Sequence, residues 1–106
     1  MEDDALRDIF AGLGPVTIKK MFGGQGIWHE GITVGVVVDG IVRLRGDAIS
    51  GPEFEAAGGR RWSYSGKERP VNMPYWTIPD CAIDDADELA VWTRKAYESA
   101  LRAKKK

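Results

Sequence analysis

The dipeptide Asp39-Gly40 constrains the fold of this chain more than any other feature, because it separates two apolar runs, residues 32–38 and 41–45. An Asp-Gly pair favours the positive φ angles that a two-residue hairpin turn needs, and the β-branched residues on both sides favour strands. The sequence therefore predicts an antiparallel hairpin. The predicted pairs are Val38 with Ile41, Val36 with Arg43, and Val34 with Arg45.

Both faces of this hairpin are apolar in that register. One face carries aliphatic residues interrupted by two arginines, namely Ile32, Val34, Val36, Val38, Ile41, Arg43 and Arg45. The other face carries Val37, Val42 and Leu44. A sheet with one solvated face would alternate apolar and polar residues more strictly. Two explanations stay open: a longer, bulged turn changes the register, or this second face is also covered, in which case Val37, Val42 and Leu44 are a candidate homodimer face.

Two other segments have the periodicity of amphipathic helices. The first begins with acidic residues, carries the stripe Leu6, Ile9, Phe10 and Leu13, and stops at Gly14-Pro15. The second covers residues 85–101, with acidic residues at its start and basic residues at its end, which complements the helix dipole. Its apolar stripe comprises Leu89, Trp92, Ala96 and Ala100, with Tyr97 and Leu101 beside them.

The remaining segments complete an antiparallel α+β pattern. Residues 16–28 are predicted to form one strand bent at its glycines, residues 50–57 a short helix, and residues 62–64 and 75–78 two strands separated by a polar loop at 65–72. The predicted order is α-β-β-β-α-β-β-α. Because the strands are grouped between helices, we expect a two-layer α+β domain with a five-stranded antiparallel sheet packed against helices.

Length and composition favour one soluble domain. The chain has 106 residues, a formal net charge of -1 and 43% hydrophobic residues, so we expect a single domain at residues 1–103 and a disordered basic tail at 104–106. The acidic start does not resemble a signal peptide, and no apolar stretch is long enough to span a bilayer. We therefore expect a cytoplasmic protein without membrane contact.

The inventory of reactive side chains does not favour an enzyme. His29 is the only histidine and lies at a predicted turn, where solvent exposure is expected; Cys81 is the only cysteine, so the chain cannot supply the ligands of a structural zinc site. The run Gly23-Gly24-Gln25-Gly26 is followed by a strand, whereas phosphate-binding glycine loops are followed by a helix. We therefore expect no catalytic residues, no metal and no cofactor.

A basic and aromatic segment offers one alternative function. The basic residues Arg60, Arg61, Lys67 and Arg69 alternate with or lie near Trp62, Tyr64, Tyr75 and Trp76. Single-strand binding proteins combine phosphate contacts with base stacking in this way. The simpler interpretation is that the aromatic residues belong to the core and the basic residues to a solvated loop.

An ordered set of motifs resembles the N-terminal domain of TfoX-type competence regulators. It consists of residues 20–27 around Met21, Phe22, Gly23, Gly24 and Gly26, the hairpin through residues 39–45, the segments 54–58 and 62–64, the stretch 73–79, and the helix start at 87–89. The resemblance implies a regulatory domain that acts with other transcription factors and is not an enzyme. It also implies that the five positions around the glycines form a shared surface or a structural bend.

Three hypotheses for function follow. The first is a regulatory domain that binds a protein partner and forms a homodimer through the sheet. The second is direct nucleic-acid binding by residues 60–69. The third is a small-molecule sensor with a pocket near the glycine bend.

Overall fold

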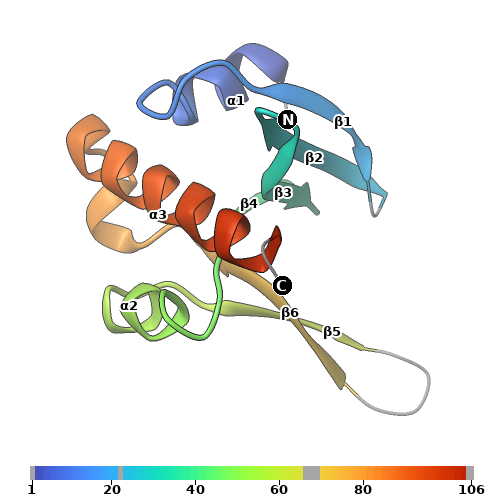
Figure 1. Ribbon diagram of the computed structural model, residues 1–106, viewed down its shortest axis with the longest axis vertical. Helices are drawn as coiled ribbons and strands as arrows, with labels where there is room; N and C mark the ends of the chain where they lie inside the picture. Colours follow the sequence, from blue (N-terminus) through green and yellow to red (C-terminus); the bar gives the residue numbers. More distant parts are fainter. Residues whose placement is uncertain (1, 22, 66–69, 105–106) are drawn as a thin grey trace.

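The computed structural model describes residues 2–21, 23–65 and 70–104, and these residues form a six-stranded antiparallel sheet with three α-helices (Figure 1). The order along the chain is α1 (Asp3–Ile9), β1 (Thr17–Met21), β2 (Gly24–His29), β3 (Ile32–Val38), β4 (Ile41–Arg45), α2 (Gly51–Ala56), β5 (Arg61–Ser65), β6 (Pro70–Thr77), the short 3-10 helix η1 (Asp80–Ala82) and α3 (Ala86–Lys104). The order across the sheet is β1-β2-β3-β4-β6-β5.

The α+β class and the antiparallel sheet agree with the sequence, whereas the predicted five strands and the predicted element order are wrong. The segment predicted as one bent strand is a hairpin, with Met21 on β1 paired to Gly24 on β2. Gly23 lies in the turn with φ 74°, a value that a side chain disfavours. Phe22 lies outside the described residues. The glycines therefore reverse the chain, and the order becomes α-β-β-β-β-α-β-β-α, with η1 before the last helix.

The other boundaries shift by a few residues. Helix α1 ends at Ile9 and is followed by turns. Helix α3 extends to Lys104, which was predicted to belong to a disordered tail. β5 and β6 reach into the predicted loop at 65–72. Within the described part of the chain, no helix has both the length and the apolar character needed to cross a membrane.

The turn at Asp39-Gly40 has the predicted register. Asp39 and Gly40 have φ angles of 55° and 74°, as in a type I′ turn, and Val38 pairs with Ile41. The bulged turn considered as one explanation is therefore wrong. A register shift does occur, but between β2 and β3, where Ile27 pairs with Gly35 and the next residue of β2 pairs with Thr33. The unpaired Val34 consequently joins the core, although strict alternation would place it on the opposite face with Val36.

The core lies between the sheet and the helices. α3 packs on β3 and β4, and α2 packs on β6 (Figure 1). The buried cluster takes residues from every layer: Leu6, Phe10, Ile27, Val34, Val37, Val42, Leu44, Phe54, Trp76, Ala82, Trp92 and Ala96. The prediction of a dimer face at Val37, Val42 and Leu44 is therefore wrong. The three side chains are at most 9% exposed, because the domain's own helices cover them.

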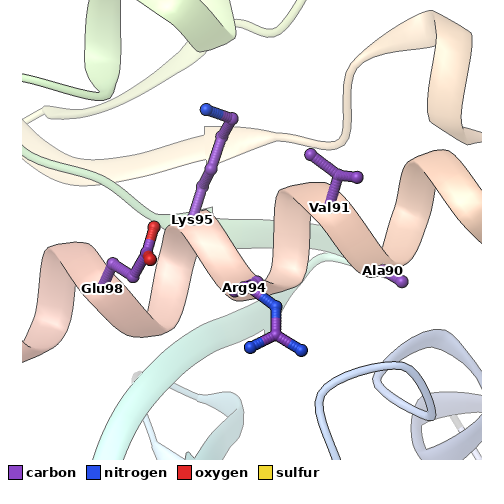
Figure 2. Close-up of a pocket in the computed structure, with 5 residues that line it drawn as sticks. All are labelled: Ala90, Val91, Arg94, Lys95 and Glu98. Carbon is purple, nitrogen blue, oxygen red and sulfur yellow. The ribbon is translucent and has the colours of Figure 1, made fainter.

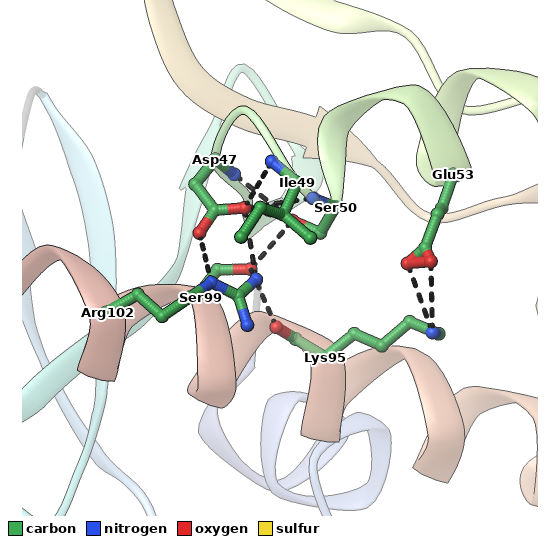
Figure 3. A network of polar contacts seen from close by, with 7 residues as sticks. All are labelled: Asp47, Ile49, Ser50, Glu53, Lys95, Ser99 and Arg102. Carbon is green, nitrogen blue, oxygen red and sulfur yellow. Dashed lines mark hydrogen bonds and ion pairs between the residues drawn. The ribbon is translucent and has the colours of Figure 1, made fainter.

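A polar network ties the segment before α2 to the end of α3 (Figure 3). Arg102 donates to the Asp47 carboxylate from Nε at 2.6 Å and from Nη2 at 3.1 Å, and the backbone N–H groups of Ile49 and Ser50 donate to the same carboxylate. The Arg102 hydrogen bond is the main reason that the pKa of Asp47 lies well below its usual range. The hydroxyls of Ser50 and Ser99 are 2.7 Å apart and link the two segments beneath this ion pair.

Candidate functional site

The face of the sheet opposite the core carries an unusual set of side chains. Along β4, Arg43 and Arg45 alternate with the core residues Val42 and Leu44, so both arginines point away from the core cluster. Across the β4–β6 pairing, Arg45 pairs with Tyr75, which also alternates with a core residue. We call this surface the outer face and define it by six residues: Lys19, Trp28, Arg43, Arg45, Trp62 and Tyr75.

Two arginines and two aromatic rings form a continuous row on the outer face. The Arg43 guanidinium lies 5.2 Å from the ring centroid of Trp62, and that ring lies 6.4 Å from the ring of Tyr75. The guanidinium of Arg45 lies 5.7 Å from the Tyr75 ring. These distances fall within the range of attractive cation–π contacts, so the rings hold the two guanidinium groups in place.

The two guanidinium groups have few hydrogen-bond partners in the described part of the chain. Arg43 donates one weak bond from Nη1 to the carbonyl of Val38 at 3.4 Å, and its Nε is buried without a partner. The Nε of Arg45 is also buried without a partner. Burial lowers the pKa of Arg43, and nearby Asp39 partly opposes this effect. Since arginine keeps its charge in proteins, the outer face holds two cations whose Nε donors have no partner among the described residues.

The other end of the outer face is built around Gly26. A Cβ atom at this position would lie 2.6 Å from the Trp28 ring and 2.7 Å from the Met21 sulfur, so the missing side chain makes room for both. Lys19, paired with Gly26 across β1 and β2, places its ammonium 5.9 Å from the Trp28 ring. Gly24 has a different role, because a Cβ there would collide with the backbone carbonyl of Val37. The structure thus assigns packing roles to Met21, Gly24 and Gly26.

The charge of the sheet differs from that of the whole chain. The six described strands contain no Asp or Glu, and their basic residues are Lys19, Lys20, Arg43, Arg45 and Arg61. The acidic residues that the structure describes lie in helices, turns and connections, and the formal charge of the whole chain is -1. The sheet is therefore a basic surface within a nearly neutral chain, and basic patches of this kind attract anionic partners.

Neither Arg60 nor Arg61, the two described residues predicted for nucleic-acid contact, is among the six residues of the outer face. Arg61 donates from Nε to the carbonyl of Met73 at 3.0 Å, and its guanidinium lies 4.7 Å from the ring of Trp76, a core residue. Arg60 is exposed next to β5, and Lys67 and Arg69 lie outside the described residues. Arg43 and Arg45 were missed as site residues, although their i, i+2 spacing within an apolar strand was visible in the sequence.

The reactive side chains are not assembled into a catalytic arrangement in the described residues. His29 is 8% exposed, so the predicted solvent exposure is wrong; its Nδ1 donates to the carbonyl of Pro15 at 2.7 Å, and its ring packs edge-on against Tyr97. Cys81 is exposed on η1. No cluster of three or more His, Cys, Asp or Glu side chains within the described ranges could hold a metal ion.

A shallow depression on α3 is formed by one helix alone. Figure 2 shows its lining residues, Ala90, Val91, Arg94, Lys95 and Glu98, which extend from successive turns of α3. Lys95 is already paired with Glu53 of α2 at 3.2 Å. Since ligand sites are usually concave and lined by several elements, this depression is a weaker candidate than the outer face.

Comparison with known proteins agrees with this fold and these motifs. Residues 8–100 match the model of the TfoX N-terminal domain. A search of curated proteins found no match. The family match covers the hairpin with the glycine motif, the outer face and most of α3. The chain therefore belongs to the TfoX N-terminal domain family.

Proposed function

We propose that this domain is a non-catalytic regulatory module and that its outer face binds an acidic segment of a protein partner. The observation that carries the proposal is that neither Arg43 nor Arg45 forms an ion pair within the described residues. Two fixed guanidinium groups on one strand are suited to carboxylates, which accept two parallel hydrogen bonds from one arginine. Arg43 and Arg45 are two positions apart, which corresponds to about 7 Å along a strand. Alternate side chains of an extended peptide have the same spacing, so two acidic side chains of one peptide can meet the two arginines.

The non-catalytic part of the proposal is supported by the surroundings of the reactive groups. The Nδ1 of His29 is engaged with Pro15, and the ring is packed in the interior. The regulatory part is supported by the family, because TfoX-type proteins are expected to act together with transcription factors in the bacterial cytoplasm. We propose that this domain likewise acts through another protein in the regulation of competence or of transcription.

Direct nucleic-acid binding is the second candidate function, supported by the basic and aromatic composition of the outer face. The geometry favours the protein partner over this candidate. Single-strand binding proteins stack bases on free ring faces, whereas here a cation of the same chain lies over Trp62 and another over Tyr75, and Tyr75 is 3% exposed. Carboxylates bind to guanidinium groups and do not need a free ring face.

The small-molecule sensor has less support. The predicted pocket near the glycine bend would need space beside Gly24 or Gly26. That space is filled by the chain itself, by the Val37 backbone in one case and by the Trp28 ring in the other.

A direct binding experiment tests the proposal. Fluorescence anisotropy would compare a labelled peptide of alternating Glu and Thr, the matching Gln-Thr peptide and oligothymidine. We expect the acidic peptide to bind and the Gln-Thr peptide not to bind. The double variant Arg43→Gln/Arg45→Gln should weaken binding by about tenfold or more, which corresponds to about 1.4 kcal/mol.

The matched control is Arg7→Gln/Arg94→Gln, which removes the same charge from two exposed helical positions. It should change the affinity by less than about twofold, because exposed charges contribute little at a distance in salt. Equal losses in both double variants would show that only net charge matters and would refute the proposal. Tighter binding of oligothymidine than of the acidic peptide would establish the nucleic-acid candidate instead.

A further inference from the structure

A second surface lies on the opposite side of the sheet, where the helices leave a gap in their layer. This groove has a volume of about 310 Å³. Val42 and Ile78 lie in its floor, Ile9 of α1 and Leu89 of α3 form two walls, and Ile41 and Ile83 line it as well. It shares no residue with the outer face.

The apolar lining of this groove reaches the solvent. Ile83 is 61% exposed and Ile41 is 43% exposed, which makes them two of the large hydrophobic residues left at the surface of the described chain. Single exposed apolar residues are common and need no explanation. Here, however, two of them continue directly into buried core residues such as Val42 and Ala82, so the exposed apolar surface is contiguous with a concave floor.

Four aspartates lie within two residues of a groove residue in the sequence. Asp8 precedes Ile9, Asp39 lies in the turn before Ile41, and Asp80 and Asp84 flank the segment that holds Ile83. All four aspartates are exposed, and none of them forms an ion pair within the described residues. Arg60, whose backbone pairs with Thr77 of the groove, is a basic neighbour. The exposed charges nearest to the groove residues in the sequence are therefore predominantly acidic, although Asp39 also acts on Arg43. We call these four aspartates the acidic rim.

We infer that the groove docks an amphipathic helix whose apolar face is flanked by lysine and arginine residues. The shape favours a helix, because the floor is a pair of strands and the walls are α1 and α3, so an added helix would fill the vacant place in the layer that covers the sheet. Helices bind such grooves through residues at i, i+3, i+4 and i+7. The acidic rim then selects basic flanks through charge complementarity.

This inference goes beyond the proposed function, because it assigns a second partner of opposite charge to another surface. A domain that holds an acidic segment on the outer face and a basic helix in the groove can bridge two proteins. The two surfaces use different residues, so either can fail experimentally without affecting the other.

The first test uses a synthetic peptide with Leu at i, i+3, i+4 and i+7 and Lys at the remaining positions. A scrambled peptide of the same composition has the same charge without the apolar stripe. We expect the amphipathic peptide to bind at least about tenfold more tightly than the scrambled one, since charge alone gives weak and salt-sensitive attraction. Methyl resonances of Ile41 and Ile83 should shift on binding. Equal affinities of the two peptides, or shifts confined to other methyl groups, would overturn the inference.

The second test uses a matched pair of variants. Ile83→Asn removes an exposed apolar side chain from the groove, and Ile49→Asn removes one with 64% exposure from the connection between β4 and α2. Neither is buried, so both variants should fold as the parent does. We expect Ile83→Asn to weaken the peptide affinity by about fivefold to tenfold, in line with the loss of one apolar contact. Similar effects of the two substitutions would exclude the groove as the docking site.

Discussion

Arg43 on β4 reaches across β6 to place its guanidinium 5.2 Å from the ring centroid of Trp62 on β5. The two residues belong to strands that do not pair with each other, so their contact requires the complete sheet order. The contact also explains how a charged side chain tolerates partial burial with a single weak hydrogen bond to a described residue, because the ring face supplies an attraction that does not use the N–H donors.

The variant Arg43→Met tests whether the Arg43 side chain contributes to stability or to binding of the acidic peptide. In Arg43→Met the unbranched stem still packs on the sheet, while the desolvated charge and its unpaired Nε are removed. We expect the free energy of unfolding to change by less than about 1 kcal/mol, because loss of the cation–π contact is offset by the lower cost of burial. Binding of the acidic peptide should fall strongly. Urea unfolding and anisotropy measure the two effects, and a loss of stability above about 2 kcal/mol would show that Arg43 serves the fold instead.

Gly26 is expected to be intolerant of any side chain as long as Trp28 is present. Gly26→Ala places a Cβ 2.6 Å from the Trp28 ring, and we expect a cost of about 1–3 kcal/mol from overpacking. A double-mutant cycle with Trp28→Ala tests the cause, because the cost should decrease once the ring is removed and only the contact with the Met21 sulfur remains. An equal cost of Gly26→Ala in both backgrounds would assign it to the Met21 contact or to the backbone and not to the aromatic packing.

The Asp47–Arg102 pair predicts a specific loss of stability in acid. The Arg102 hydrogen bond holds the pKa of Asp47 in the folded state below its value of about 4 in the unfolded chain. The pair therefore stabilises the fold fully above that pH, and the contribution decreases as the pH falls further and the carboxylate is protonated. Urea unfolding between neutral pH and about pH 2 should show about 2 kcal/mol more loss in the parent than in Asp47→Asn.

The control for this experiment is Asp84→Asn, which removes an exposed carboxylate without an ion pair in the described residues. Its acid dependence should match that of the parent. If Asp47→Asn also followed the parent curve, the ion pair would not contribute to stability.

The variant Leu44→Ala tests whether this face of the sheet belongs to the core or mediates association between chains. The Leu44 side chain is fully buried against the helices, so Leu44→Ala should lower the free energy of unfolding by about 2–5 kcal/mol. Ile49→Ala, at an exposed position, should cost less than about 0.5 kcal/mol. Thermal unfolding at two protein concentrations completes the test. A melting temperature that rises with protein concentration in the parent but not in Leu44→Ala would contradict a purely intramolecular role for this face.

Local signals in the sequence predicted part of the fold. The turn at Asp39-Gly40 and the pairing of Val38 with Ile41 were predicted because Asp-Gly favours one turn geometry. Helix α3 was predicted from its periodicity and charge distribution. The hairpin between β1 and β2 was missed, because consecutive glycines are equally compatible with a bent strand and with a turn.

The outer face could not be predicted from local patterns. Arg43 meets Trp62 only because β4 pairs with β6, and that pairing joins segments far apart in the sequence. The bulge that directs the Val34 side chain into the core also depends on the register between β3 and its neighbour β2. Single-sequence periodicity describes which residues share a face of one strand, but it does not say which strands become neighbours.

The pairing of β4 with β6 joins two parts of the sheet that are each formed locally, the meander β1 to β4 and the hairpin of β5 and β6. The recorded pairs at this seam are Arg43 with Thr77, Leu44 with Trp76, and Arg45 with Tyr75. We expect this long-range pairing to form after the local hairpins, because closing a longer loop costs more entropy before any contact is gained. In that order, both arginines of the outer face would receive their aromatic contacts when β4 pairs with β6. A partner bound to the outer face would contact both parts of the sheet. It would therefore slow the separation of β4 from β6, and it would recognise only chains in which this pairing has formed.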